Sequence, residues 1–353
     1  MAGLVNEIIC GDCIEVLNGI GEPFADLVFA DPPFNIGYQY DKYHDKVKKD
    51  RYLAWTRDWM AACIGVLKPH GSFYIAIGDE YAAHVRLIGE KLGLTLRNWI
   101  IWHYTFGQQT KTMFARSHAH IFYFVMDPKA FTFNDFAVRV PSDRQLIYND
   151  KRADSRGKLP DDVWNTFSRV CGTFRERCAW HPCQMPEMLL GRIIAASSNP
   201  GDVVLDPFLG SATTAAAAVK LNRRFAGIEL SANYAAKARE RIDAIIQATE
   251  HPESVPPSEP PTLFASQPTG PLNPWEVFEL QRLYVEVGIN AAEVLNRPAL
   301  LELYAQQLGL RMNNGRQYAP GDLVGVLKEM TTWVPQKNPK VGSVQRACAP
   351  SRP

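Results

Sequence analysis

The sequence lacks a long apolar run: no stretch approaches the roughly 20 residues that are needed to span a bilayer. Its first residues, MAGLVNEIICGDC, contain neither a basic segment nor an extended apolar one, so we expect no secretory signal and no membrane partner. Cysteine is scarce too, with seven residues scattered over 353 positions. An odd, dispersed set is not typical of a disulfide framework and favours a reducing, cytoplasmic setting.

The sequence also has almost no net charge, +1 at neutral pH, which neither favours nor excludes nucleic acid as a partner. The charge is unevenly distributed, however. Residues 1–96 carry 9 basic and 13 acidic side chains, a balance of −4, whereas residues 97–180 carry 13 basic and 8 acidic ones, a balance of +5. A locally basic segment can neutralise phosphates in a neutral protein, although an ordinary solvated surface explains the pattern equally well.

What the sequence does have is an alternation of short apolar strands with helices. A segment of helical periodicity begins at Arg51 and ends before Pro69, and a second region of alternating elements starts near residue 186. This alternation predicts an α/β fold with a doubly wound, mostly parallel, Rossmann-like sheet that helices cover on both faces. The strands expected in the first half are residues 7–11, 25–30, 71–77, 96–104 and 119–125.

The rest of the chain divides by composition. Residues 126–177 mix Arg, Lys, Asn, Gln and aromatic residues without a clear period, and an irregular segment of this length inside a domain is usually functional. Residues 249–271 are rich in proline and polar residues, which predicts a linker. A small helical module is expected at 272–334 and a disordered tail at 335–353.

Three acidic residues follow or end predicted parallel strands. Asp31 follows ADLVFA, Asp206 ends DVVLD, and Glu229 ends RRFAGIE. Because ligands of open parallel sheets bind beyond the carboxyl ends of the strands, we expect the three carboxylates to face one crevice.

A nucleotide fingerprint with phosphate-binding glycines is absent from the turn that follows Asp206. The turn reads Gly210-Ser211-Ala212 and not G-x-G-x-x-G, which argues against a dinucleotide. A small-residue turn, with an acid that ends the neighbouring strand, still suits a nucleoside that has no phosphates, because the acid accepts hydrogen bonds from the ribose hydroxyls. Ordinary α/β packing is the alternative.

The four residues Asp31, Pro32, Pro33 and Phe34 present acceptors and few donors, because each proline removes a backbone N–H. An exocyclic amino group of a nucleobase donates two hydrogen bonds, so the Asp31 carboxylate and the Pro32 carbonyl suit it. Such bonds would free the nitrogen lone pair to attack a sulfonium methyl group, while Phe34 stacks on the base. A base in a duplex reaches such a site only when it is flipped out of the stack.

These segments resemble one known family. DPPF at 31–34 is similar to the catalytic motif of the DNA amino-methyltransferases, and HPCQMPEMLLGRIIAASSNPGDVVLDPFLGSATT at 181–214 resembles their cofactor-binding block. IICGDCIEVL at 8–17 resembles the segment that opens such chains. The catalytic motif precedes the cofactor motif, which is the circularly permuted order of the β class. The resemblance spans about residues 7–245.

The resemblance implies the fold of S-adenosylmethionine-dependent methyltransferases and a role for each matching residue. Thr213 and Thr214 would cap a helix, Glu229 would bind the ribose, and Asp12 would meet the adenine of the cofactor. The implied catalytic residues are Asp31, Pro32, Pro33 and Phe34, and the implied cofactor-binding residues are Asp12, His181, Gln184, Asp206, Phe208, Gly210, Ser211, Thr213, Thr214 and Glu229.

The resemblance also implies a division of the methyltransferase domain, residues 1–248. The catalytic half would be 1–125, a target recognition region would lie at about 105–180, and the cofactor half would be 181–248. Two residues depart from the family pattern: Ala212 replaces a usual glycine, and Met185 replaces a usual lysine. An alanine is acceptable there unless the backbone requires a positive φ.

The resemblance implies a prokaryotic or phage-encoded, nucleoid-associated enzyme that uses S-adenosylmethionine to methylate N6 of adenine in double-stranded DNA. Asp31 favours adenine, because relatives that act on cytosine more often carry serine there. An N4-cytosine enzyme and a non-catalytic DNA-binding relative remain alternatives. No metal is expected: Cys10 and Cys13 form a C-x-x-C pair, but the second group, Cys178, His181 and Cys183, is irregularly spaced, and His181 has a better role at the cofactor. A homodimer and a cognate restriction endonuclease are left open as partners.

Overall fold

The computed structural model describes residues 4–108, 110–148, 150, 152–171, 174, 176–250 and 272–331. Most of the expected linker and the whole of the expected tail therefore lie outside the described residues. Within the described part of the chain, no helix is long and apolar enough to cross a membrane.

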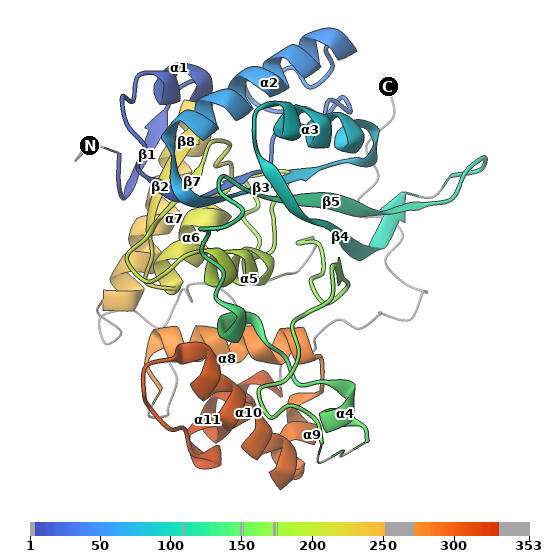
Figure 1. Ribbon diagram of the computed structural model, residues 1–353, viewed down its shortest axis with the longest axis vertical. Helices are drawn as coiled ribbons and strands as arrows, with labels where there is room; N and C mark the ends of the chain where they lie inside the picture. The colour runs from blue at the N-terminus through green and yellow to red at the C-terminus, as the bar shows by residue number, and fades with distance from the viewer. Residues whose placement is uncertain are drawn as a thin grey trace.

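The centre of the protein is an eight-stranded sheet with the order β1-β8-β7-β2-β3-β5-β4-β6 (Figure 1). All neighbouring strands pair in parallel except β5, which runs antiparallel to β3 and β4. The predicted α/β, mostly parallel sheet is thus confirmed. The strands are β1 (Glu7–Cys10), β2 (Ala25–Ala30), β3 (Leu67–Ile77), β4 (Thr95–Gln108), β5 (Arg116–Val125), β6 (Val163–Trp164), β7 (Val203–Asp206) and β8 (Arg224–Glu229).

Helices cover both faces of the sheet, as Figure 1 shows. Strand β2 explains why: its side chains alternate, with Leu27 and Phe29 in one apolar cluster and Val28 and Ala30 in the other. The cluster with Val28 and Ala30 is covered by α1 (Cys13–Asn18), α2 (Lys49–Val66) and α3 (Asp79–Lys91). The cluster with Leu27 and Phe29 is covered by α5 (Glu187–Ser197), α6 (Thr213–Lys220) and α7 (Ala232–Glu250).

The segment predicted as a target recognition region is only partly irregular. Strand β5 lies inside the sheet, between β3 and β4, and forms with β4 a long hairpin that projects to the right in Figure 1. After β5 the chain contains the short 3-10 helix η1 (Asp135–Val138), the one-turn helix α4 (Asp143–Leu146) and β6. The absence of periodicity beyond residue 126 thus corresponds to short elements joined by loops.

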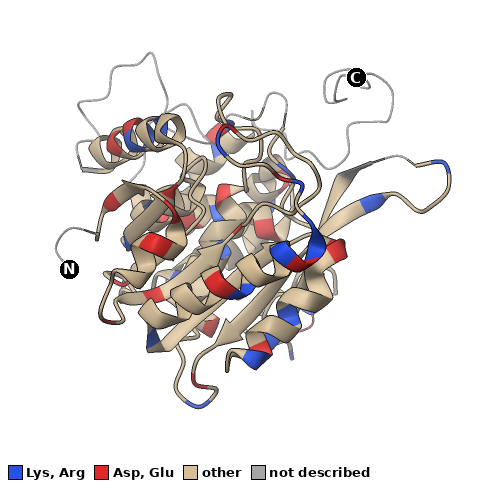
Figure 2. Cartoon of the chain, turned by 90° about the horizontal axis from the view of Figure 1, so that it is seen from above, with Lys and Arg blue, Asp and Glu red and all other residues tan. Residues whose placement is uncertain are grey.

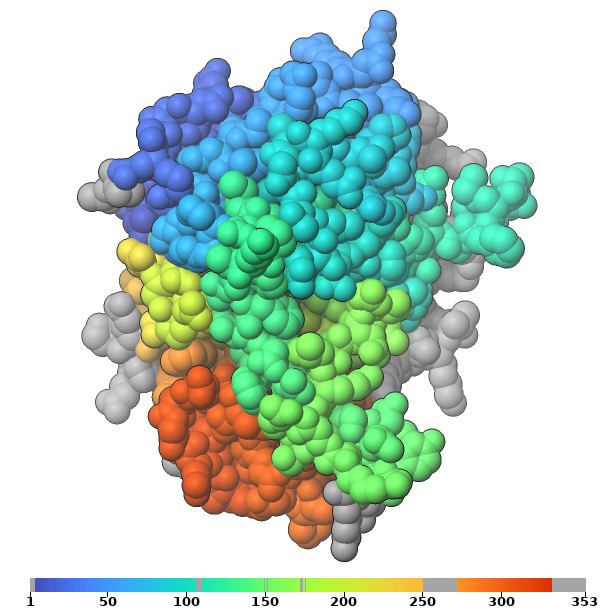
Figure 3. All heavy atoms as spheres, in the orientation of Figure 1, coloured from blue at the N-terminus to red at the C-terminus, as the bar shows by residue number. Residues whose placement is uncertain are grey.

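Four helices follow the linker and pack around an apolar cluster of their own, which includes Leu283, Tyr304 and Leu327. Helix α8 begins with Asn273, whose side chain accepts from the Glu276 N–H while the Glu276 side chain accepts from the Asn273 N–H. Figure 3 shows these helices, in orange and red, directly against the green segment that follows β5. They are α8 (Pro274–Val287), α9 (Ala291–Asn296), α10 (Pro298–Met312) and α11 (Pro320–Met330).

Candidate active site

A pocket opens at the edge of the sheet where the parallel strands β2, β7 and β8 end. It contains about 1050 Å³ of empty space, part of which is open to solvent. Asp31 follows β2, Asp206 ends β7 and Glu229 ends β8, and all three line this pocket, where open α/β sheets bind ligands. The sequence-predicted site residues on its wall are Asp12, Asp31, Pro33, His181, Asp206, Phe208, Gly210, Ser211, Thr213, Thr214 and Glu229.

Three predicted site residues are not part of this wall. Pro32 is buried, and Phe34 packs over Gly78, where a Cβ atom would lie 3.2 Å from its ring. Gln184 is used by the loop that precedes α5: its Nε2 donates to the Glu176 carbonyl (2.6 Å) and its Oε1 accepts from the Cys178 N–H (2.7 Å). The structure therefore engages the Gln184 side chain with the backbone of its own loop, between Cys183 and Met185, which line the pocket.

The turn that carries Asp31 is held from outside the pocket. The Tyr52 hydroxyl of α2 donates to the Pro33 carbonyl at 2.6 Å, so this acceptor is already engaged. Asn35 has a positive φ of 60° and its side chain bonds the backbone of Val47 through both its oxygen (2.7 Å) and its nitrogen (3.0 Å). These contacts fix the turn, which leaves the Asp31 carboxylate at the end of β2 to face the pocket.

Asp45 organises the loop that follows this turn. Its carboxylate is 1% exposed and accepts from the backbone N–H groups of Asn35 (2.6 Å), Ile36 (3.2 Å) and Tyr38 (2.9 Å). The same loop crosses to the end of β8, where the Ser231 hydroxyl donates to Asp41 at 2.5 Å. The loop therefore forms one wall of the pocket.

The carboxylates of Asp206 and Glu229 are held by local donors. Asp206 accepts from the Phe208 N–H (2.9 Å) and the Thr214 hydroxyl (2.5 Å), and Glu229 accepts from the N–H groups of Gly210 (2.9 Å) and Ser231 (2.8 Å). Three of these donors are backbone N–H groups in turns that follow a strand, and the fourth is the Thr214 hydroxyl in the first turn of α6. The acids are thereby positioned mainly by the backbone of these turns.

Burial dominates the protonation of these acids. It raises the pKa of Asp31 to about 7, and the nearby Asp206 carboxylate adds to the rise while Arg169 opposes it. It also raises the pKa of Asp206 to about 7, against the hydrogen bonds from Thr214 and Phe208. The pKa of Glu229 is raised for the same reason. A cationic or hydrogen-bond-donating ligand in the pocket would favour the ionised forms of all three.

The turn between β7 and α6 shows why its residues are small. Gly210 has a φ of +50°, and a Cβ atom there would lie 2.8 Å from Nε2 of His181. Ala212 has a φ of 62° and is the N-cap of α6. The backbone at this departure from the family pattern thus does require a positive φ, so the alanine is strained. The expected capping by Thr213 and Thr214 is corrected: Thr213 and Thr214 are the first helical residues, and the Thr214 hydroxyl binds Asp206.

Two other predicted residues meet the pocket in different ways. Asp12 caps α1, since its Oδ1 accepts from the N–H groups of Ile14 (2.8 Å) and Glu15 (3.2 Å). His181 is 8% exposed, and its Nδ1 is buried without a hydrogen-bond partner among the described residues. Burial lowers the pKa of His181 to about 4, so the ring is neutral at physiological pH.

Several wall residues were not predicted from the sequence. They lie on the loop after the catalytic motif, on α2, on the loop before α5, or between the end of β8 and the first turns of α7, and no local motif identifies them. Aromatic composition near DPPF is the one signal that points to some of them. They are Tyr40, Asp41, Lys42, Tyr43, Trp55, Cys183, Met185, Ser231 and Tyr234.

The chemistry available here is hydrogen bonding and charge stabilisation by carboxylates. Two buried acids with a pKa of about 7 and a third with a raised pKa surround one pocket with aromatic side chains on its wall. Such a pocket suits a ligand with donors and a positive charge. Among the described residues, no group of three or more His, Cys, Asp and Glu side chains is arranged to hold a metal ion.

Comparisons with known proteins agree with this geometry. The model of the N6/N4 methyltransferase family, described as DNA methylase, matches residues 25–240, more than half of the chain. The chain is 40% identical over 244 residues to the DNA adenine methyltransferase YhdJ of Escherichia coli K12, covering 67% of this chain and 82% of that protein. It is 38% identical over 240 residues to the type II methyltransferase M.HpaI of Haemophilus parainfluenzae, covering 67% and 74%.

Solved structures show the same fold. A DNA modification methylase of Thermus thermophilus, complexed with S-adenosyl-L-methionine, superposes with a TM-score of 0.50 at 24% identity, over 68% of this chain and 94% of that one. The PvuII DNA methyltransferase, which is cytosine-N4-specific, gives 0.51 at 19% identity, over 68% and 91%. The fold, the family model and the two relatives together establish that this chain belongs to the DNA methylase family of N6/N4 methyltransferases.

Proposed function

We propose that this protein transfers the methyl group of S-adenosylmethionine to N6 of an adenine that is flipped out of double-stranded DNA. The observation that carries the proposal is the convergence of Asp31, Asp206 and Glu229 on one pocket at the carboxyl edge of the sheet. The 40% identity to a DNA adenine methyltransferase supports adenine as the base.

In this proposal Asp31 and the Pro32 carbonyl accept the two hydrogen bonds of the adenine amino group, and Phe34 stacks on the base. The Pro33 carbonyl is engaged by Tyr52, so it is not the second acceptor. The nitrogen lone pair forms a bond with the methyl carbon, and the carbon–sulfur bond breaks to leave a neutral thioether. The methylated nitrogen then loses one proton, for which the Asp31 carboxylate is the acceptor at hand.

The cofactor would occupy the rest of the pocket, where the residues present fit its groups. Glu229 would accept from the ribose hydroxyls and Asp12 from the adenine amino group, while His181 presents a buried nitrogen without a partner among the described residues. S-adenosylmethionine supplies an electrophilic methyl group on a positively charged sulfur. The residues proposed for its methionine end are Asp206, Phe208, Gly210, Ser211, Thr213 and Thr214.

We further propose the β-class order, in which the catalytic motif at 31–34 precedes the cofactor turn at 206–214. Residues from about 105 to 180 would read the DNA sequence, within a methyltransferase domain of residues 1–248. The protein would act at the nucleoid, in the cytoplasm. A homodimer and a cognate restriction endonuclease are compatible with this function and do not enter the argument.

The test is methylation of unmethylated bacterial genomic DNA by purified protein with S-adenosylmethionine, followed by digestion to nucleosides and mass spectrometry. The variant Asp31→Ala is compared with Asp58→Ala, an exposed acid of α2 that pairs with Arg57 at the surface. We expect N6-methyladenine from the wild type and from Asp58→Ala, and none from Asp31→Ala.

Two other outcomes would change the proposal. N4-methylcytosine in place of N6-methyladenine would keep the mechanism and overturn the choice of base, because both reactions use the same acceptors. No methylated nucleoside from the wild type, together with no binding of S-adenosylmethionine, would identify a non-catalytic DNA-binding relative.

A further inference from the structure

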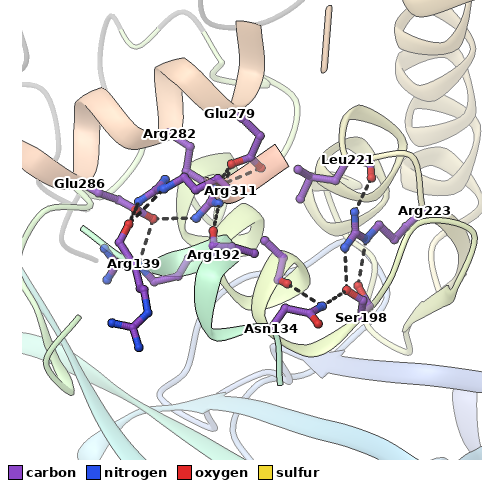
Figure 4. A network of polar contacts seen from close by, with 12 residues as sticks. Asn134, Arg139, Arg192, Ser198, Leu221, Arg223, Glu279, Arg282, Glu286 and Arg311 are labelled. Carbon is purple, nitrogen blue, oxygen red and sulfur yellow. Dashed lines mark hydrogen bonds and ion pairs between the residues drawn. The ribbon is translucent and has the colours of Figure 1, made fainter. Parts of the chain in front are cut away.

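A buried cluster of charges joins the C-terminal helices to the methyltransferase domain (Figure 4). At its centre, the Glu286 carboxylate of α8 accepts from three arginines: Arg192 Nε of α5 (3.0 Å), Arg282 Nη1 of α8 (3.0 Å) and Arg311 Nη2 of α10 (2.5 Å). Arg282 also pairs with Glu279 (2.6 Å). The side chains of Glu286, Arg282 and Arg311 are 0% exposed and that of Arg192 is 6% exposed.

Two of these arginines continue from the cluster to the backbone of the segment after β5. Arg311 donates to the Arg139 carbonyl through both Nε (3.1 Å) and Nη2 (2.8 Å), and Arg282 donates to the Ala137 carbonyl. The guanidinium group supplies several donors in a rigid plane, so one arginine binds a carboxylate and a carbonyl at once. Glu286 is thus linked to residues 137–139 through single side chains.

The same segment closes on itself at this point to form a loop. Val140 and Lys158 exchange backbone hydrogen bonds of 2.9 and 2.8 Å, and Arg139 Nη1 donates to the Gly157 carbonyl at 3.0 Å. A Cβ atom at Gly157 would overlap the Val140 carbonyl oxygen, so only glycine permits this approach. We call the described residues between 140 and 158 the α4 loop, because they contain α4.

The α4 loop presents the kind of surface that meets nucleic acid. Tyr148 is 73% exposed and Ile147 is 69% exposed, and three partly exposed arginines belong to the same loop. Each arginine pairs with an aspartate of the loop, such as Arg152 with Asp150 (2.9 Å). Pairs this exposed are weak, so phosphate groups can compete for the arginines. The three are Arg144, Arg152 and Arg156.

The β4–β5 hairpin lies at the edge of the sheet at which the pocket opens. In Figure 1 this hairpin projects to the right, whereas the α4 loop lies lower, beside the C-terminal helices. Strands β2, β3 and β4 run in the same direction, so the right-hand end of β4 belongs to the edge at which the pocket opens. Figure 2 shows Lys and Arg, in blue, at the tip of this hairpin and on the strand that leaves it. A duplex at the pocket would therefore pass close to a basic hairpin.

Helix α5 connects this cluster with the pocket. Near its start, Glu187 pairs with Arg241 (2.7 Å), which donates to the Ser211 carbonyl of the cofactor turn at 2.5 Å. Farther along α5, Arg192 pairs with Glu286. One rigid helix therefore sets the position of the cofactor turn on one side and of the C-terminal helices on the other.

We propose that the C-terminal helices, residues 272–331, position the α4 loop for reading DNA, with Glu286 and Arg311 as the positioning residues. The inference rests on the proposed function, because it supposes that DNA is the substrate. Buried ion pairs contribute little net stability compared with apolar packing, but they fix one arrangement of the groups they join. Here that arrangement is the placement of a basic, aromatic loop relative to the pocket.

The test compares two glutamates on the same helix. Glu286→Gln removes the charge that joins α8, α5 and α10, whereas Glu276→Gln removes a comparably buried charge that pairs with Arg316 (2.9 Å) inside the C-terminal helices. Each variant methylates unmethylated bacterial genomic DNA, and the modified sites are read by single-molecule sequencing. The KM for DNA, the Kd for S-adenosylmethionine and the Tm are measured alongside.

We expect Glu286→Gln to raise the KM for DNA by about tenfold or more and to increase methylation at sites that differ by one base pair, because small misplacements of positioning elements have large effects. The Kd for S-adenosylmethionine should change by less than about twofold. Glu276→Gln should lower the Tm and leave both DNA measurements at their wild-type values. Equal site preference and equal KM in the two variants would overturn the inference.

Arg311→Met keeps the inference testable if Glu286→Gln does not fold. It leaves Glu286 paired with Arg192 and Arg282 and removes the bonds to the Arg139 carbonyl. It should relax site preference as Glu286→Gln does, and hydrogen exchange of the Val140 and Lys158 amides should accelerate. Unchanged site preference with faster exchange would show that the tie is only structural and overturn the inference. Absence of methylation by the wild type would instead contradict the proposed function.

Discussion

Two regions of this protein bury carboxylates, and they do so in opposite ways. Burial raises the pKa of Asp31 and of Asp206 in the pocket to about 7. Burial alone would also raise the pKa of Glu286, but Arg192, Arg311 and Arg282 lower it to about 2. Among the described residues the pocket acids form no ion pair, although Arg169 lowers the pKa of Asp31, whereas Glu286 pairs with three arginines.

The pocket acids are available to bind a ligand, whereas Glu286 holds structural elements together. An acid that is held by backbone and hydroxyl donors, with no cation beside it, is stabilised in its ionised form only when a ligand supplies charge or donors. An acid that is matched by arginines has its partners already and fixes the elements that carry them. The raised pKa values of Asp31 and Asp206 therefore fit a ligand site, and the lowered pKa of Glu286 fits a structural contact between helices.

The largest effect is expected from the catalytic turn. Asp31→Asn should lower the methylation rate by about 10² to 10³, because the amide keeps an acceptor oxygen but loses the negative charge that stabilises the developing positive charge on the nitrogen and takes its proton. The Kd for S-adenosylmethionine should stay within about threefold, as measured by calorimetry. A full loss of cofactor binding would show that Asp31 belongs to the cofactor site instead.

The next effect concerns stability and differs in sign between the two regions. Glu286→Gln should lower the free energy of unfolding by about 3 kcal/mol, because it leaves buried arginines without their counter-charge. Asp206→Asn should raise the free energy of unfolding of the unliganded protein at pH 8 by about 1 kcal/mol, because it removes a buried charge that has only neutral donors. Urea unfolding of each variant without cofactor measures the two changes in the free energy of unfolding. Changes of the same sign would contradict the proposed difference between the two regions.

The pH dependence of the two regions should also be opposite. The folded-state pKa of Asp206 lies above its unfolded value, so its contribution to stability is present at low pH and is lost as the pH rises from about 4 to about 7. The folded-state pKa of Glu286 lies below its unfolded value, so its contribution is present above about pH 4.5 and is lost as the pH falls towards 2. Unfolding of Asp206→Asn and Glu286→Gln across this range separates the two contributions.

Binding of the cofactor should release protons for the same reason. A sulfonium beside Asp31 and Asp206 favours their ionised forms and lowers their pKa values. The affinity for S-adenosylmethionine should therefore rise by a few fold from pH 6 to pH 8. Calorimetry in buffers of different ionisation enthalpy counts the protons, and S-adenosylhomocysteine, which lacks the charge, is the control. Equal proton release by both ligands would contradict this explanation.

The smallest effect is expected at Ala212. Among the described residues, the other non-glycine residues with a positive φ are asparagines, which tolerate this conformation. Ala212→Gly should therefore raise the free energy of unfolding by about 0.5 kcal/mol, the relief of strain being partly offset by the greater freedom of glycine when unfolded. Gly210→Ala in the same turn should destabilise, because its Cβ atom would meet His181. A lower stability of Ala212→Gly would show that the turn is not strained.

Local pattern was enough to predict the sheet and the convergence of its acids. Alternation of strands and helices indicates a parallel sheet, and the carboxyl ends of parallel strands share one edge. Asp31, Asp206 and Glu229 could therefore be placed together from their positions after three predicted strands. The family resemblance also named Gln184, and only the structure shows that its side chain bonds the backbone of its own loop, because side-chain partners in an irregular loop do not follow from a periodic pattern.

The sequence by itself determined all strands of the sheet except the two-residue β6, and the edge at which the ligand site lies, because period and spacing are local properties. Only the tertiary structure decided that Tyr52 engages the Pro33 carbonyl, that Ala212 adopts a positive φ, and that Arg311 reaches Arg139 across 172 residues of sequence. Such contacts depend on which helix packs against which loop. Where this packing buries an arginine or a glutamate, the side chain must find a partner, because an unpaired buried charge is costly.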